Sequence, residues 1–189
     1  MKFISTPING IYIIEPNVIN DSRGYFFENF KDDIFKNKFP FINFCQENES
    51  KSSYGVLRGL HYQLPPFAQT KLVRVISGSV LDVVLDIRVG SPTFAKHFSV
   101  ILNDENKKQL LVPRGFAHGF VVLSKEAVFT YKVDNYYDKK SERGILFNDK
   151  KLNINWRLEF EKIKVSKKDS IMPLLDDADL FKYSDNLYE

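Results

Sequence analysis

Short runs of alternating apolar and polar residues, separated by turn residues, recur along the chain and predict many antiparallel strands. The clearest run covers residues 79–88, where Leu, Val and Ile at the odd positions from 81 onward alternate with Asp82, Asp86 and Arg88. We expect this strand to have one dry face and one charged face. Ser77 and Gly78 supply a tight turn from the strand before it.

The same pattern predicts further strands at residues 11–15, 24–30, 71–76, 98–102, 109–112, 120–123 and 128–133. About nine or ten strands in a chain of this size indicate a sandwich or closed barrel. A short helix is predicted at Asp32 to Lys38, with acidic residues near its start. Ser166 to Asp169 is typical of a cap opening a second short helix, and Asp176 to Leu180 of a further turn. The expected fold is mainly β, with short peripheral helices at the N-terminal third and the C-terminus.

The length of 189 residues suits one well-buried core. We therefore predict a single domain over residues 1–189, with a C-terminal appendage from about residue 166. The 27 basic and 24 acidic residues are too balanced to indicate a nucleic-acid partner. No apolar stretch is long enough for a membrane span or signal peptide, so a cytoplasmic location is expected. Cys45 is the single cysteine, which leaves no intrachain disulfide or cysteine-based zinc site.

Three histidines are candidates for chemistry. His97 lies on the polar side of its predicted strand and is expected at the surface. His61 follows Arg58 and Gly59, and in a regular strand Arg58 and His61 would point to opposite faces. A bulge at Gly59 could re-aim one of them, as is common beside active sites. From this segment alone, a satisfied core histidine and a functional one are about equally supported.

His118 lies in a turn-then-strand pattern, PRGFAHGF, in which Pro113 and Gly115 set the bend. This pattern resembles the second motif of the cupin barrels. Cupin metal sites usually need a His-x-His pair and a Glu in the first motif, and the His61-Tyr62-Gln63 run does not supply that pair. The sequence therefore favours a cupin-like jelly-roll barrel without a metal site.

Lys71 and Arg74 share a predicted strand, and taken alone such a pair is more often a solvated edge than a site. Tyr131 shares its face with Phe129 and Val133, so packing is the simpler interpretation, with its hydroxyl needing a partner if buried. Neither segment decides the function by itself.

Taken together, the motifs resemble the nucleotide-sugar 3,5-epimerases of deoxysugar synthesis over nearly the whole chain. The matching segments are DSRGYFFE (21–28), QEN (46–48), GVLRGLHYQ (55–63), AQTKLVR (68–74), SPTF (91–94), GFAHGF (115–120), Tyr131-Lys132 and SKKD (166–169). The resemblance implies a cupin-like jelly roll without metal or other cofactor. It also implies a homodimer with exchanged N-terminal strands.

The resemblance further implies acid–base chemistry on a dTDP-linked 4-keto-6-deoxysugar, dTDP-4-dehydro-6-deoxy-D-glucose, whose carbons 3 and 5 are both inverted. His61 would be the base, and an imidazole, with a reference pKa of about 6.5, suits that role near neutrality. Tyr131 would be the acid, Asp169 the carboxylate that orients the base, and Lys71 the cation that stabilises the enolate oxygen.

The resemblance implies a second set of residues that hold the nucleotide sugar. These are Arg23, Phe26, Glu28, Gln46, Asn48, Arg58, His118, Phe120, Glu142 and Lys167 or Lys168. The chain also departs from the family pattern. Glu47 and Glu49 flank Asn48 where Asp and His are common, Thr70 replaces a usual glycine, and Arg114 stands at a usually acidic position.

Other functions stay open at this stage. A relative could invert a single carbon, or act on another nucleotide-linked 4-keto sugar, with the same His61 and Tyr131. A 3,4-ketoisomerase fits the motifs less well. A non-catalytic sugar-nucleotide binding module would be expected to lack the acid and base, and a metal-dependent cupin oxygenase would need a metal.

Overall fold

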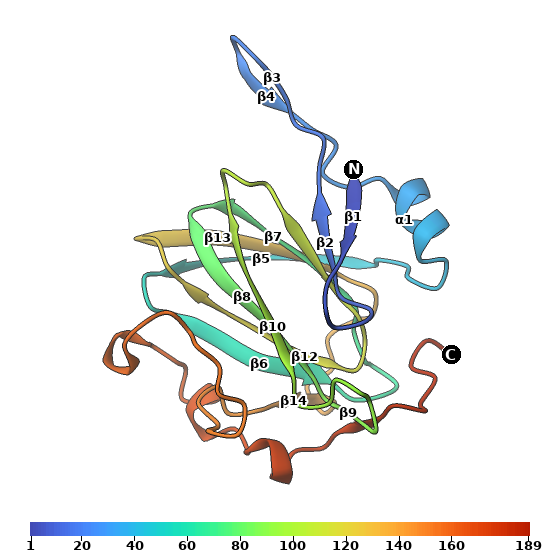
Figure 1. Cartoon of the computed structure of the whole chain (residues 1–189), viewed down its shortest axis with the longest axis vertical. Coiled ribbons are helices and arrows are strands. Elements are labelled where there is room, and N and C mark those ends of the chain that lie inside the picture. Colours follow the sequence, from blue (N-terminus) through green and yellow to red (C-terminus); the bar gives the residue numbers. More distant parts are fainter.

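Two antiparallel sheets face each other and form a β-sandwich in the computed structural model, which describes residues 1–189 (Figure 1). The six-stranded sheet has the order β1 (Lys2–Ser5), β2 (Tyr12–Glu15), β11 (Gln109–Val112), β7 (Lys71–Ser77), β13 (Glu126–Val133), β5 (Gln46–Ser53). The five-stranded sheet has the order β10 (His97–Asn103), β8 (Ser79–Asp86), β12 (Phe116–Val122), β6 (Leu57–Gln63), β14 (Glu142–Gly144). The expected mainly β, cupin-like architecture is confirmed.

The main core lies between the two sheets. Val73 of β7 and Phe129 of β13 meet Val84 of β8 and Phe120 of β12 there, in a cluster of 14 buried residues. Burial of such apolar side chains contributes about 1.5–3 kcal/mol for each large one. Both walls are therefore rigid enough to hold polar side chains at fixed positions between them.

Residues 145–189, which follow β14 and are orange to red in Figure 1, cover the outer face of the five-stranded sheet. Trp156, Leu175 and Phe181 belong there to the same buried cluster as Leu81 and Leu85 of β8. Three short 3-10 helices lie in this part of the chain: η1 (Phe160–Lys162), η2 (Asp169–Ile171) and η3 (Leu175–Asp177). β15 (Phe181–Lys182) pairs in parallel with β9 (Arg88–Val89).

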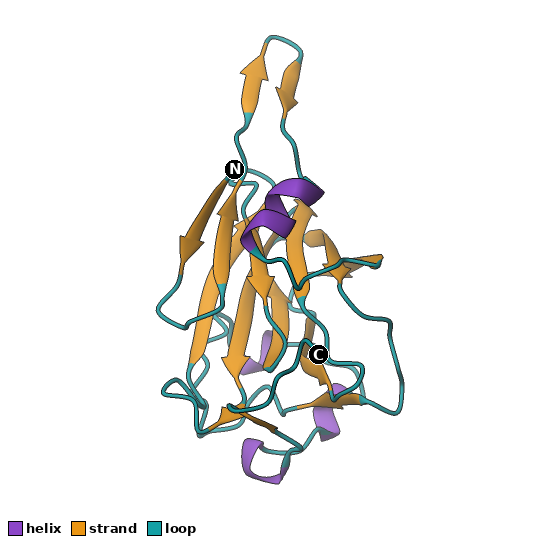
Figure 2. Cartoon of the chain, turned by 90° about the vertical axis from the view of Figure 1, so that its right-hand side faces the viewer, coloured by secondary structure: helices purple, strands orange, loops and turns teal.

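The N-terminal part contains one helix and a hairpin. The helix α1 (Asp32–Lys38) lies where the sequence predicts it and buries Phe35 against Ile14 and Leu72 of the six-stranded sheet. The hairpin of β3 (Ile19–Asp21) and β4 (Gly24–Phe26) stands away from the rest of the chain (Figure 2). Its strand ends at Phe26, four residues before the end predicted from the pattern. The longest helix has seven residues, so no helix here could cross a membrane.

The prediction of a charged face on residues 79–88 is wrong. Both faces of β8 are buried, and Asp82 and Asp86 have no exposed surface. Residues 145–189 cover the apolar face of β8. On the other face, Asp82 is bonded to His118, while Asp86 accepts hydrogen bonds from Arg88, Ser91 and Thr93. A buried carboxylate with such partners is stable inside a protein, and the SPTF segment supplies two of them.

Candidate active site

His61 and Asp169 form a hydrogen-bonded pair beside a cavity between the sheets. His61 Nε2 lies 2.7 Å from Asp169 Oδ1. Asp169 begins η2, and its backbone N–H donates to the Ser166 hydroxyl at 3.0 Å, as the predicted cap requires. Burial acts to raise the pKa of Asp169, but hydrogen bonds from His61 and the Gly59 backbone hold that pKa below its usual value. The ionised carboxylate can orient the imidazole and stabilise its charged form.

A bulge in β6 brings Arg58 and His61 to the same cavity. In the β6–β12 ladder His118 is opposite His61 and Phe120 is opposite Arg58, so β6 has one residue more than β12 between these pairs. The bulge predicted at Gly59 is therefore confirmed, and both Arg58 and His61 line the cavity.

Lys71 and Tyr131 reach the cavity from the six-stranded sheet, opposite the sheet that carries His61. Lys71 Nζ donates to the backbone oxygen of His61 at 3.4 Å. Burial lowers the pKa of Lys71 to about 8, although the carboxylates of Asp82 and Glu142 oppose the shift. The side chain is thus mostly an ammonium at neutral pH, in a site where its charge is poorly screened.

Tyr131 is placed to carry a proton on the wall opposite His61. Burial raises the pKa of its phenol, and the Asn48 side chain and the Arg58 guanidinium act in the other direction. The phenol therefore holds its proton at neutral pH and can donate it. Arg58 also donates from Nε to the Ser52 hydroxyl at 3.1 Å, which fixes its side chain beside the cavity.

The cavity has two parts. The larger, of about 300 Å³, is lined by Glu49, Ser50, Leu57, Arg58, His61, Lys71, His118, Phe120, Phe129, Tyr131, Ser166, Lys168 and Asp169. The smaller, of about 140 Å³, is lined by Asn48, His61, Tyr62, Gln63, Gln69, Lys71, Tyr131, Tyr137 and Glu142. His61, Lys71 and Tyr131 line both parts. They therefore occupy the junction where a ligand filling both parts would be held from two sides.

His118 is buried behind the larger part with a carboxylate of its own. Its Nε2 lies 2.9 and 3.0 Å from the two oxygens of Asp82. Phe120 stacks on Phe129 with ring centroids 4.1 Å apart, which gives the cavity an aromatic wall. The sequence pointed to His118 and Phe120, but it placed Asp82 on a solvated face and so missed this pair.

Glu142 and Lys168 form part of the cavity rim. Lys168 Nζ is 2.7 Å from Glu142 Oε1, and the Tyr137 hydroxyl donates to Glu142 Oε2 at 3.0 Å. Burial acts to raise the pKa of Glu142, but the bond to Lys168 keeps it below the usual value. Of the two lysines considered, Lys168 lines the cavity and Lys167 does not.

Two predicted binding residues lie on the β5 edge of the site. Asn48 lines the smaller part of the cavity, and Gln46 donates from Nε2 to Asn48 Oδ1 at 2.7 Å. Gln46 therefore acts on the site through the Asn48 amide rather than by lining the cavity. Glu49 and Ser50 of the same strand line the larger part and were missed.

Arg23, Phe26 and Glu28 line neither part of the cavity of their own chain. Arg23 and Phe26 lie in the projecting hairpin, at the top of Figure 1. The Arg23 guanidinium pairs with Asp21 at 2.6 Å, and its side chain is 88% exposed. Phe26 is 67% exposed. The structure of one chain does not bring these three predicted residues to the site.

His97 is half-buried at the start of β10, so it is more enclosed than the expected surface position. Burial lowers the pKa of its imidazole, which lies against the backbone of Leu152. The segment after β14, which includes Leu152, covers this strand end, and the strand pattern does not reveal that packing. No group of three or more His, Cys, Asp and Glu side chains is placed to share a metal ion.

The imidazole of His61 lies on one sheet and is paired with a carboxylate from η2, while a phenol and an ammonium reach the same cavity from the other sheet. This arrangement defines an acid–base enzyme built on a cupin-like sandwich. A sequence model described as dTDP-4-dehydrorhamnose 3,5-epimerase matches residues 5–177. The chain belongs to the dTDP-4-dehydrorhamnose 3,5-epimerase family, a family of isomerases.

The similarity extends over nearly the whole chain. The dTDP-4-dehydrorhamnose 3,5-epimerase of Shigella flexneri is 50% identical over 181 residues, which are 95% of this chain and 93% of the relative. The crystal structure of dTDP-6-deoxy-D-glucose-3,5-epimerase from Legionella pneumophila, in complex with dTDP-4-keto-L-rhamnose, matches with a TM-score of 0.93 at 45% identity, covering 97% of this chain and 99% of that one.

A 3'-monoepimerase from Streptomyces bikiniensis, in complex with dTDP-quinovose, has the same fold. It matches with a TM-score of 0.84 at 32% identity, covering 90% of this chain and 86% of that one. The fold therefore occurs in enzymes that differ in the number of carbons they invert.

Proposed function

We propose that this chain inverts carbons 3 and 5 of dTDP-4-dehydro-6-deoxy-D-glucose and so forms dTDP-4-dehydro-L-rhamnose, in the synthesis of dTDP-L-rhamnose. The observation that carries the proposal is that His61 of the five-stranded sheet, paired with Asp169 of η2, and Tyr131 of the six-stranded sheet lie beside one cavity. Inversion of a carbon needs a proton taken from one face of the sugar and a proton returned to the other.

The chemistry follows from the keto group at carbon 4, which acidifies the protons on carbons 3 and 5. His61 accepts one of these protons, and Asp169 stabilises the imidazolium that results. The electron pair moves onto the carbon 4 oxygen, where the Lys71 ammonium stabilises the enolate. Tyr131 then delivers a proton to the opposite face of the carbon, and the keto group re-forms. Proton exchange with water returns His61 to its neutral form and Tyr131 to its protonated form before the second carbon reacts.

The nucleotide part of the substrate needs cationic and aromatic partners. Arg58 and Lys168 at the larger part of the cavity suit the diphosphate, since a guanidinium can make forked contacts with phosphate oxygens. Phe120, stacked on Phe129, offers an aromatic surface to the base or sugar. We assign binding roles also to His118, Glu142, Asn48 and, through Asn48, to Gln46.

Every proton carrier in this scheme is a side chain of the protein, so we propose that the reaction needs no cofactor. Treatment with a chelator should then leave turnover unchanged. A loss restored by added iron or nickel would instead support a metal-dependent cupin.

We place the enzyme in the cytoplasm, since its substrate is a nucleotide sugar.

We further propose a homodimer in which the β3–β4 hairpin of one chain reaches the site of its partner. The hairpin exposes Ile19, Tyr25 and Phe26 to solvent in the single chain. An apolar patch of this kind, on an arm that stands away from its own chain, is typical of an interface. This arrangement would give Arg23, Phe26 and Glu28 their expected role in binding.

We treat residues 1–189 as one domain, since the segment from about 166 packs on the sandwich.

The experiment that tests the function supplies the dTDP-linked keto sugar in deuterated water and follows carbons 3 and 5 by NMR. An NADPH-dependent reductase for the product, added in a second assay, reports turnover. Deuterium at both carbons and NADPH consumption are expected. Inversion at one carbon would indicate a mono-epimerase, and binding without any exchange would indicate a non-catalytic module.

A further inference from the structure

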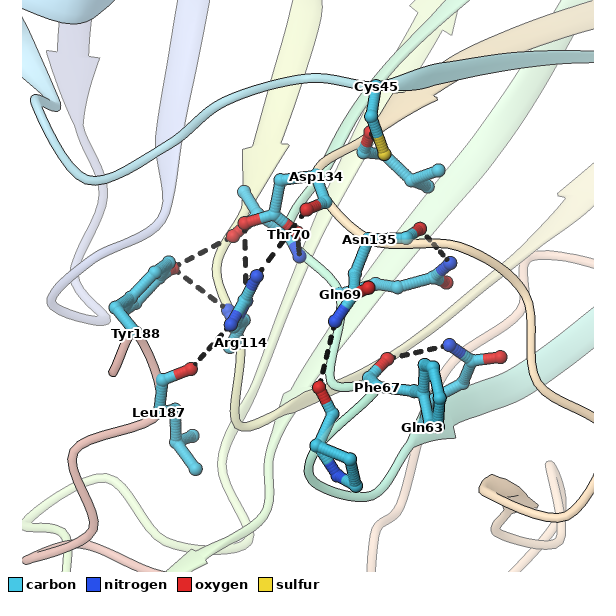
Figure 3. A network of polar contacts seen from close by, with 12 residues as sticks. Cys45, Gln63, Phe67, Gln69, Thr70, Arg114, Asp134, Asn135, Leu187 and Tyr188 are labelled. Atoms are coloured by element: carbon cyan, nitrogen blue, oxygen red, sulfur yellow. Dashed lines mark hydrogen bonds and ion pairs between the residues drawn. The ribbon is translucent and has the colours of Figure 1, made fainter.

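Three strand ends of the six-stranded sheet meet the C-terminal tail in a network of polar contacts (Figure 3). The Tyr188 hydroxyl is 2.9 Å from Thr70 Oγ1 and accepts the backbone N–H of Arg114 at 3.2 Å. Arg114 donates from Nη1 to the backbone oxygen of Leu187 at 2.7 Å and from Nε to Asp134 Oδ2 at 3.2 Å. The Thr70 backbone N–H donates to Asp134 Oδ1 at 2.6 Å.

This network is shielded from water. Thr70 has no exposed surface, and the Asp134 side chain is 1% exposed. Burial raises the pKa of the Tyr188 phenol, so the hydroxyl keeps its proton. Because the hydroxyl already accepts from the Arg114 backbone, that proton is available to Thr70 Oγ1. A buried network in which each member has partners holds its parts in one arrangement.

The network is joined directly to the catalytic strands. Thr70 immediately precedes Lys71, the first residue of β7, and Asp134 immediately follows Val133, the last residue of β13. Lys71 is paired with Val133 in the β7–β13 ladder, and Tyr131 lies two residues further along β13. Tyr188 itself lines neither part of the cavity. It can therefore affect the site only through the strand ends it holds.

The two residues that bind Tyr188 each supply a group that the contact with the tail requires. A glycine at position 70 would offer no hydroxyl to Tyr188. An acidic residue at position 114 would place a second negative charge beside Asp134 and would have no guanidinium for the Leu187 oxygen. Thr70, Arg114 and the tail residues Leu187 and Tyr188 thus depend on one another for these hydrogen bonds.

We propose that Tyr188 is a positioning residue: by binding Thr70 and Arg114, the C-terminal tail fixes the start of β7 and so the place of the Lys71 ammonium in the active site. The inference rests on the proposed function, in which Lys71 stabilises the enolate. Displacement of such a group by a fraction of an ångström lowers turnover without weakening the binding of the substrate.

The test compares Tyr188→Phe with Tyr183→Phe, the same change at another tail tyrosine. Tyr183 packs its ring near the Arg88 guanidinium and is 47% exposed. We expect Tyr188→Phe to lower kcat roughly 3–10-fold with KM within about twofold of wild type. Tyr183→Phe should leave both unchanged. Thr70→Val should match Tyr188→Phe, and the double variant should lose no more than either single one.

Two further measurements separate positioning from simple stabilisation. Hydrogen exchange should become faster at residues 68–76 in Tyr188→Phe. The fall of kcat/KM at alkaline pH should also move to higher pH, because water admitted at the start of β7 would better solvate Lys71. The Asp82 and Glu142 carboxylates lie near its ammonium, and Arg58, His61, His118 and Tyr131 line the same part of the cavity. A lower melting temperature with unchanged kcat and pH profile would reject the inference.

The exchange measurement also keeps this inference distinct from the proposed function. A wild-type protein that is inactive on the keto sugar, yet shows faster exchange at 68–76 in Tyr188→Phe, would count against the function alone. Unchanged exchange in that segment would overturn the positioning role whatever the activity.

Discussion

His61 and His118 lie directly opposite each other in the β6–β12 ladder, and the Nε2 atom of each is hydrogen-bonded to a different carboxylate. The His61 side chain is 24% exposed and the His118 side chain 7%. An imidazole that exchanges protons with a substrate must reach it, whereas a buried imidazole can serve binding and packing. The two pairs therefore suit different roles, although their hydrogen bonds are alike.

Asp169→Asn and Asp82→Asn should thus differ in their effects. Asp169→Asn removes the charge that stabilises the His61 imidazolium and should lower kcat on the order of 10²–10⁴-fold. Asp82→Asn leaves that pair intact and should lower kcat less than about tenfold. The pH above which kcat/KM falls should move to a lower value in this variant, because Asp82 supports the Lys71 charge. Steady-state kinetics from about pH 6 to 10 compare them. Equal losses of kcat would contradict the separate roles.

Tyr131→Phe should uncouple proton removal from inversion. His61 and Lys71 remain in place, so the substrate can still form the enolate and exchange its proton with solvent. Without the phenol, delivery of a proton to the opposite face fails, and product should fall on the order of 10²-fold. NMR in deuterated water measures exchange and product together. Unchanged product formation would remove Tyr131 from the mechanism.

The pKa of Lys71 predicts the alkaline limit of activity. In the proposed scheme the ammonium is the active form, and burial lowers its pKa in the free chain to about 8, so kcat/KM should fall as the pH rises through that value. The Tyr131 phenol stays protonated longer, because burial raises its pKa. Lys71→Arg should keep part of the activity and move the limit to higher pH, since a guanidinium stays charged. A limit unchanged in Lys71→Arg would show that another group sets it.

The lowered pKa of Lys71 also predicts that the folded chain becomes more stable as the pH rises, while its activity falls. The pKa of Lys71 is lower in the folded chain than its ordinary value of 10.5, so the unfolded chain binds more protons between about pH 8 and that value. The contribution of Lys71 to the free energy of unfolding is unfavourable at neutral pH and improves across this window. Lys71→Met should be more stable than wild type at neutral pH, by a margin that narrows as the pH rises through the window. Denaturant titrations at several pH values measure it.

The sequence predicted the strands best where one face meets the core. Residues 71–76, 109–112 and 128–133 became β7, β11 and β13 with bounds that differ by two residues at most. β5 was missed because its sequence, QENESKSS, has no apolar residues, since this edge strand turns polar side chains to the cavity and solvent. The alternation of apolar and polar residues could therefore not predict β5.

The site was predicted largely through the family motifs, and what they missed depends on tertiary packing. Asp82 was misplaced because alternating charge on a strand usually marks a solvated face, whereas the six-stranded sheet covers this face and His118 pairs with the carboxylate. The role of Tyr188 had no local signal at all, because its partners Thr70 and Arg114 are distant in sequence.

The bulge in β6 depends on two glycines that touch. A Cβ on Gly59 would lie 2.5 Å from the Gly119 Cα and 3.0 Å from the His118 oxygen, and Gly59 has a φ of +139°. Gly59→Ala should therefore destabilise the chain by about 3 kcal/mol or more and displace His61. Gly90→Ala is the matched control, with a φ of +91° and only the Tyr183 Cβ within 4 Å of the added Cβ, at 3.8 Å. It should cost only about 1 kcal/mol, as the strain alone predicts. Equal midpoints in denaturant would show that the contact with Gly119 is unimportant.

The exchanged hairpin predicts that two inactive variants restore each other. Arg23→Ala should weaken substrate binding, and His61→Ala should lower turnover on the order of a thousandfold. If Arg23 acts in the partner's site, a mixed dimer holds one site with both residues intact. Refolding the two variants together in equal amounts should then restore about a quarter of wild-type activity at low substrate, since half of the dimers are mixed. A mixture no more active than the sum of its components would place Arg23 outside the partner's site.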